Sequence, residues 1–138
     1  MWVLFGWANG QIAPDAVAAH HQDALHDEGP VYQLRIYEIF EPNKAAFHAR
    51  FRDHALPIMR KYGFNIRSMW ESRLNGRTEF VYLLEWPSES VMKDRWAKFM
   101  ADEEWARIKQ ETARQHGTLV GQIQDRTLKT LEYSPVLR

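Results

Sequence analysis

The sequence predicts an α+β domain with the β-α-β-β-α-β order of a ferredoxin-like antiparallel sheet. Two observations support this prediction. Strand-like and helical segments follow one another in this order, and an Asn75-Gly76 pair separates the second and third strands along the chain. Asn-Gly is the strongest short-range signal for a two-residue hairpin, because both residues tolerate positive φ. With 138 residues, of which 45% are apolar, the chain is long enough to bury one core.

The first strand is expected at 31–40, where apolar and polar side chains alternate. A helix is expected at 44–62, because apolar residues recur there at helical spacing. Asn43 is of a type that caps helix N-termini, and Gly63 is of the type that ends helices. The sequence therefore predicts both where this helix begins and where it ends.

His54 lies on the apolar face of this predicted helix, beside Phe47 and Phe51. Pro57 removes one amide hydrogen bond and crowds a carbonyl, so we expect a kink or break near 53–57. A partly buried imidazole at such a break could bond the freed backbone. It could equally act as a general base near neutral pH. Both interpretations, packing and catalysis, stay open for this residue.

The remaining predicted elements are two strands, a second helix in two halves, and a last strand: 64–73, 78–86, 91–100, 103–116 and 118–133. Ser88 is the expected cap of the first half-helix, and Asp102 with its acidic neighbours begins the second. The second helix of the ferredoxin-like plan is thus expected to be split.

In such a sheet the helices cover one face and leave the other bare. We expect the bare face to carry a mixed set of side chains: Gln33, Arg35, Tyr37, Gln124 and Arg126. A bare face of four strands must be covered or serve as a binding surface. A second copy related by a twofold axis would cover it, so a homodimer is expected.

Four stretches carry a resemblance to a known family. They are Tyr32-Gln-Leu-Arg-Ile-Tyr37; His54-Ala-Leu-Pro57 with Lys61 and Gly63; Phe80-Val-Tyr-Leu-Leu-Glu-Trp-Pro-Ser88; and Arg95-Trp-Ala-Lys-Phe99 followed by Asp102-Glu-Glu-Trp105. In this order and spacing, the chain from about Val31 to Tyr133 resembles the NIPSNAP family. The resemblance implies a dimeric α+β barrel. It implies less about activity, because the wider superfamily includes cofactor-free monooxygenases, haem-handling enzymes and small isomerases.

Arg35 is the second candidate for a catalytic residue, after His54. A buried arginine needs a partner, and Glu85 is the carboxylate expected to supply a structural ion pair. The alternative is that Arg35 binds the carboxylate of a substrate. The candidate ligand-binding residues are Tyr37, Trp70, Glu85, Trp86, Trp96 and Trp105. Such tryptophans are most often core or dimer interface, and the alternative is an apolar cavity for an aromatic or lipid-like ligand.

Composition excludes several classes of function. Basic and acidic residues balance at 18 each, so no net field attracts nucleic acid or an anionic membrane. The absence of cysteine excludes disulfides and thiolate metal sites. No apolar run approaches the roughly 18 residues of a membrane span, and no metal-binding or phosphate-binding motif occurs. We therefore expect no metal, no cofactor and no membrane span.

Residues 1–29 form a histidine-containing tail without a basic residue, and we expect 30–138 to be the folded domain. The start lacks the positive region of a secretory signal, so a cytoplasmic location is expected. A secreted or periplasmic location is the alternative if the start is a truncated signal. The expected function is a homodimeric domain that binds a small organic ligand or a partner protein. The alternative is a cofactor-independent monooxygenase-like enzyme or isomerase with His54 as its base.

Overall fold

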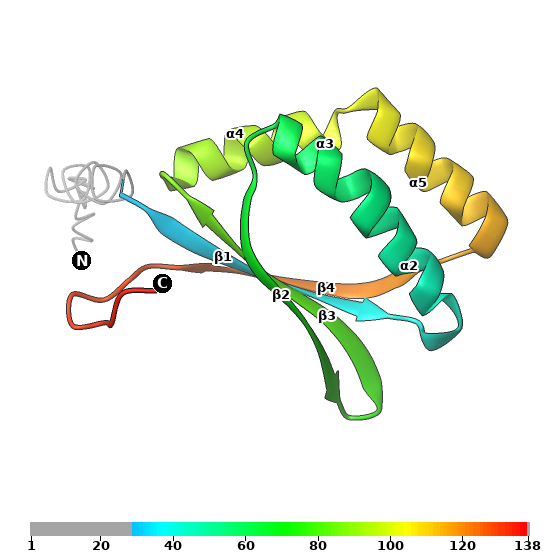
Figure 1. The fold of residues 1–138 in the computed structure, drawn as a ribbon, viewed down its shortest axis with the longest axis horizontal. Helices are drawn as coiled ribbons and strands as arrows, with labels where there is room; N and C mark the ends of the chain where they lie inside the picture. The colour runs from blue at the N-terminus through cyan, green and yellow to red at the C-terminus, as the bar shows by residue number, and fades with distance from the viewer. Residues whose placement is uncertain (1–28, 138) are drawn as a thin grey trace, which may run out of the picture.

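The computed structural model describes residues 29–137 and has the predicted order of elements (Figure 1). The predicted tail lies outside the described residues, apart from Gly29. All neighbouring strands are antiparallel, in the spatial order β2-β3-β1-β4. The strands are β1 Val31–Ile39, β2 Asn65–Leu74, β3 Arg77–Trp86 and β4 Val120–Leu128. The ferredoxin-like sheet predicted from the sequence is therefore confirmed.

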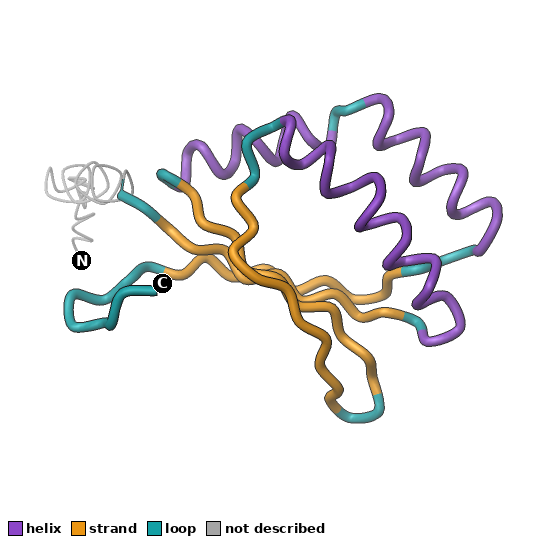
Figure 2. Tube along the Cα trace, in the orientation of Figure 1, coloured by secondary structure: helices purple, strands orange, loops and turns teal. Residues whose placement is uncertain are grey.

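All of the helices lie over one face of the sheet (Figures 1 and 2). They are η1 Glu41–Asn43, α2 Lys44–Arg50, η2 Phe51–Ala55, α3 Leu56–Lys61, α4 Glu89–Met100 and α5 Glu103–His116. The predicted split of the second helix is present. Ser88 Oγ accepts from the Val91 amide at 3.1 Å, and Asp102 Oδ1 accepts from the Trp105 amide at 2.8 Å. These two caps explain where α4 and α5 begin.

Pro57 disturbs the first helix where the sequence predicted, but the helix does not break. Residues Phe51–Ala55 form a π-helical turn, and α3 then continues with Pro57 in its first turn. The backbone ladder runs on from this turn, since the Leu56 amide donates to the Phe51 carbonyl, and Pro57 lacks the next amide donor. The wider turn therefore absorbs the defect. Such turns also change which side chains face the sheet.

Asn43 does not cap α2, which corrects the expectation from the sequence. Its side-chain amide instead donates to two backbone carbonyls, those of His116 at 3.0 Å and Thr118 at 2.9 Å. The His116 carbonyl is at the end of α5, where helix carbonyls have no intrahelical donor, and Thr118 follows just after the helix. Asn43 thus ties the end of α5 to the start of α2.

The β2–β3 hairpin has the predicted two-residue turn. Asn75 has φ 52° and Gly76 has φ 74°, both in the left-handed region. Two consecutive positive φ values match the twist of the flanking strands. The hairpin extends away from the helix layer as a long twisted ribbon (Figure 1).

The two faces of β1 are the reverse of what was expected. Gln33 is 2% exposed and Tyr37 is 9% exposed, and both lie beneath the helices together with Arg35. Of the expected set, only Gln124 and Arg126 belong to the bare face, because they lie opposite Ile36 and Leu34 in the β1–β4 ladder.

The bare face is instead largely apolar, and we call it the open face. Its apolar residues are Tyr32, Leu34, Ile36, Trp70, Val81, Leu83 and Leu128. None of the seven is fully buried, and Trp70 and Leu128 are 49% and 40% exposed. The prediction for β1 was wrong because it placed the face with polar side chains toward solvent. Here they are buried and hydrogen-bond with one another, which satisfies most of their polar atoms, and Arg35 Nε is the buried side-chain atom left without a partner among the described residues.

The core between helices and sheet is mainly aromatic. Phe47 and Phe51 from the first helix pack on Phe80 and Tyr82 of β3, with ring centroids 4.7–5.5 Å apart in three of these contacts. Burying each such ring contributes roughly 1.5–3 kcal/mol. This packing fixes the first helix against the sheet and so positions the residues that it carries on its other side.

Candidate functional site

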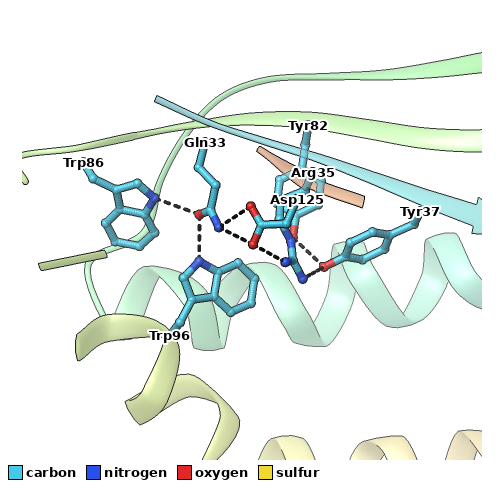
Figure 3. A network of polar contacts seen from close by, with 7 residues as sticks. All are labelled: Gln33, Arg35, Tyr37, Tyr82, Trp86, Trp96 and Asp125. Carbon is cyan, nitrogen blue, oxygen red and sulfur yellow. Dashed lines mark hydrogen bonds and ion pairs between the residues drawn. The ribbon is translucent and has the colours of Figure 1, made fainter. Parts of the chain in front are cut away.

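Seven side chains beneath the helices form one connected polar network (Figure 3). They are Gln33, Arg35 and Tyr37 on β1, Tyr82 and Trp86 on β3, Trp96 on α4 and Asp125 on β4. We call this set the β1 network. Its members come from four elements that are far apart in the sequence, so they meet only in the folded sheet.

Gln33 lies at the centre of the β1 network. Its Oε1 accepts hydrogen bonds from the indole nitrogens of Trp96, at 2.7 Å, and Trp86, at 3.0 Å. Its Nε2 donates to both carboxylate oxygens of Asp125 at 3.0 Å. The side-chain amide therefore uses donor and acceptor atoms together, and a buried amide left unpaired would cost about 1–3 kcal/mol. Gln33 holds α4 against the sheet through the Trp96 indole.

Arg35 binds Asp125, so the predicted pair with Glu85 is wrong. Arg35 Nη1 lies 2.8 Å from Asp125 Oδ2, and the two residues face each other in the β1–β4 ladder. On its other side Arg35 faces Tyr82. Glu85 is three positions further along β3, so it points to the opposite face, where it pairs with Arg67. The carboxylate that Arg35 binds is thus the protein's own.

Tyr37 extends the β1 network toward the first helix. Arg35 Nη2 donates to the Tyr37 hydroxyl at 3.1 Å, and that hydroxyl lies 2.6 Å from the hydroxyl of Tyr82. Burial raises the pKa of Tyr82 well above its usual value, so this phenol keeps its proton. The Arg35 guanidinium also stacks on Trp96, 4.4 Å from the ring centroid. The network is therefore ordered by stacking as well as by hydrogen bonds.

His54 does not face the sheet, contrary to expectation. It is an exposed residue of the π-helical turn, whereas its neighbour Ala55 is fully buried. The prediction assumed a regular step of 100° per residue, and the wider turn shifts that register. Among the described residues, His54 has no hydrogen-bond partner, so the expected bond to freed backbone is absent. Its imidazole lies in a surface groove instead.

This groove, about 500 Å³ in volume, lies between the α2–η2 segment and α5, and we call it the α2–α5 groove. Ala46, Ala49 and Ile108 supply apolar lining, while His54 and His116 supply imidazoles from opposite sides. Small-molecule sites generally combine an apolar lining with a few polar groups and have volumes of roughly 300–1,000 Å³. The volume of the groove lies in this range, and its lining differs in having more polar than apolar residues.

Arg50 also lines the α2–α5 groove, and its side chain is half-buried there. Burial lowers the pKa of Arg50 from its ordinary value, which reflects withdrawal of the guanidinium from water. Its observed contact is with the Trp105 ring, whose centroid is 5.5 Å from the guanidinium carbon. No carboxylate in the described part of the chain pairs with it. Arg50 thus presents an unneutralised charge to the groove.

The candidate tryptophans do not form one site. Trp86 and Trp96 belong to the β1 network, and Trp105 stacks on Phe99 with centroids 5.3 Å apart. Trp70 lies on the open face, as does Glu85, on the other side of the sheet. The structure therefore brings Arg35, Tyr37, Trp86 and Trp96 together and separates them from Trp70 and Glu85.

Several residues of these sites were missed in the sequence, among them Gln33, Arg50 and Asp125. Gln33 and Arg35 alternate with Tyr37, a signal that all three share a face of β1. Arg50 precedes His54 by four positions, so the two share a side of the helix. No comparable signal identifies Asp125, because the register of an edge strand is set by pairing.

Within residues 29–137, no three His, Asp or Glu side chains are grouped to hold a metal ion. No helix in this part of the chain is long and apolar enough to cross a membrane.

The fold and site define a class of protein: a ferredoxin-like antiparallel sheet with its helices on one face and a ligand-sized groove in the helix layer. An uncharacterized NIPSNAP-like domain protein from Burkholderia xenovorans has this fold, with a TM-score of 0.64 and 20% identity over 80% of this chain and 93% of that one. A NIPSNAP family protein of unknown function from Agrobacterium tumefaciens matches with a TM-score of 0.65 and 20% identity over 81% and 97% of the two chains.

A cofactor-independent oxygenase from Streptomyces nogalater is more distant, with a TM-score of 0.51 and 14% identity over 78% of this chain and 98% of that one. Likeness at such identities shows the fold alone. The sequence profile of the NIPSNAP family matches residues 32–135. The chain therefore belongs to the NIPSNAP family, which confirms the resemblance seen in the sequence. No curated protein matches it by sequence.

Proposed function

We propose that this NIPSNAP protein is a homodimeric domain that binds a small organic molecule in the α2–α5 groove of each subunit. The observation that carries the proposal is the groove itself, which has ligand-like volume, a few apolar residues and polar groups that converge from two elements. A small molecule is preferred to a partner protein because the groove is a concave site of ligand-like volume between two helices.

The homodimer is supported by the open face. Leu34, Ile36, Val81 and Leu83 lie side by side at its centre, in two neighbouring strands. Contiguous apolar surface on a sheet generally packs against something, and a twofold axis lets the same surface serve both subunits. Size-exclusion chromatography with light scattering should give a dimer at micromolar concentration, and a monomer would contradict the barrel.

Fragment mapping by NMR tests the ligand-binding function. A library of small aromatic and aliphatic compounds is titrated into isotope-labelled full-length protein. Hits should shift backbone amides in 46–54 and 107–116. A variant with Ala49→Phe fills the groove and should lose these shifts, whereas Ala97→Phe, at an exposed site on α4, should keep them. Hits that map only elsewhere would refute the proposal.

A second candidate function is a cofactor-independent reaction with His54 as general base. The specific observation in its favour is that His54 lines the groove with both ring nitrogens unengaged within the described residues. A general base needs such a nitrogen within reach of the substrate proton. Groove-binding fragments incubated with the protein would then be consumed, and His54→Asn should abolish turnover while leaving binding intact.

A further inference from the structure

The α2–α5 groove has an unbalanced charge. Its two carboxylates are already neutralised from outside the groove. Asp53 binds Arg52 at 2.8 Å, and Glu111 binds Arg114 at 2.6 Å. The groove's own guanidiniums have no such partner: Arg50 and Arg107 form no ion pair with any described residue. The charge that remains to be matched by a ligand is therefore positive.

Arg50 is the stronger of these two cations as an anchor. Arg107 is exposed, so water solvates it, whereas Arg50 is half-buried against Trp105. A charge withdrawn from water without a partner is unfavourable, and an anion that binds it recovers the lost solvation. The contact with the Trp105 ring also restrains the guanidinium, so less side-chain entropy is lost when a ligand binds.

We infer that the α2–α5 groove binds small organic carboxylates. Arg50 forms an ion pair with the carboxylate, and the apolar residues contact the rest of the ligand. The inference rests on the proposed function and names its ligand class. Ala46, Ala49 and Ile108 form the apolar part of the groove lining, so a ligand with an apolar group beside its carboxylate can contact them. A guanidinium presents paired donors that match a carboxylate in a planar bidentate contact.

A phosphate ligand fits the groove less well. Phosphate sites generally use several backbone amides at a glycine-rich turn or a helix N-terminus. No glycine lines this groove, and Arg50 lies at the end of α2 rather than at its start. One half-buried guanidinium, without such backbone amides, favours the monovalent carboxylate.

Matched acid and amide pairs test the inference, beginning with 3-phenylpropionate and 3-phenylpropanamide titrated into the full-length protein by NMR. The acids should bind about tenfold or more tightly than their amides, as expected for a charge-assisted contact. In Arg50→Gln the preference should vanish. In Arg60→Gln, at an exposed site of α3 outside the groove, it should persist. Arg107→Gln should reduce acid binding two- to fivefold, which provides a second readout if Arg50→Gln unfolds.

The outcomes separate the two proposals. If neutral fragments bind the groove as tightly as the acids, or if the acid preference survives Arg50→Gln, the carboxylate inference is wrong and the ligand-binding function stands. Phenyl phosphate binding at least as tightly as 3-phenylpropionate would also overturn the inference. If no compound of either kind shifts the groove amides, the proposed function itself fails.

Discussion

Arg35 on β1 and Asp125 on β4 lie directly opposite each other, with the guanidinium 2.8 Å from the carboxylate. Gln33 binds the same carboxylate, so one acidic residue of an edge strand joins two polar side chains of β1. β4 is otherwise mostly exposed. This pair therefore ties the edge strand to the sheet.

Replacing Asp125 should destabilise the protein. Asp125→Ala leaves the largely buried Arg35 without its counter-charge and Gln33 without its acceptor. Because Asp125 is itself 45% exposed, we expect a loss of about 1–3 kcal/mol in urea unfolding. Asp94→Ala, which removes an exposed ion pair with Lys98, should cost no more than roughly 0.5 kcal/mol. Equal losses in the two variants would contradict the structural role.

Replacing Gln33 should destabilise the protein more than replacing an exposed glutamine. Gln33→Leu removes the acceptor of two indole N–H groups and the donor to Asp125, so we expect a loss of roughly 2–4 kcal/mol. Urea unfolding followed by tryptophan fluorescence measures the loss. Gln110→Leu on exposed α5 surface is the control, expected within about 0.5 kcal/mol of wild type.

The open face should be the dimer interface. Leu83→Glu places a charge at the centre of that face and should convert the dimer to a monomer in light scattering. Met100→Glu introduces the same charge at a 56% exposed site of α4, and that variant should remain a dimer. A dimer that tolerates Leu83→Glu would place the interface elsewhere.

Asp102 should make stability depend on pH. Hydrogen bonds from the Tyr62 hydroxyl and the Trp105 amide hold the pKa of Asp102 below its usual value. The ionised form therefore stabilises the fold above the unfolded pKa of about 3.9, and this contribution is lost as the pH falls through the lower folded pKa.

We expect Asp102→Ala to cost about 1–2 kcal/mol at pH 7, because it removes the cap of α5 as well. The gap between wild type and variant should narrow at pH 3. Thermal unfolding at the two pH values checks this, and a gap that widens on acidification would show the sign to be wrong.

His54 should contribute little to stability. Because the imidazole is exposed and unbonded, His54→Asn should change the free energy of unfolding by no more than roughly 0.5 kcal/mol. A core histidine would lose about 1–3 kcal/mol instead. Differential scanning calorimetry distinguishes the two. A large loss of stability would show that His54 has a packing role.

Much of the fold was predictable because its signals are local. Asn75-Gly76 specifies a turn through its own φ preferences, and Ser88 and Asp102 cap helices through atoms only three residues away. Pro57 marked the site of a helix defect, but not its form. Whether a helix breaks or widens depends on how its neighbours pack.

The sequence by itself determined the order of elements, their approximate bounds and the family. Only the tertiary structure decided which face of β1 is covered, that Arg35 pairs with Asp125, and that His54 lies with Arg50 in a groove. The reason is physical. Alternation divides a strand into two faces but does not say which one is buried, and polar side chains that bond one another can be buried as well as apolar ones. Sheet register and one π-helical turn settled these questions.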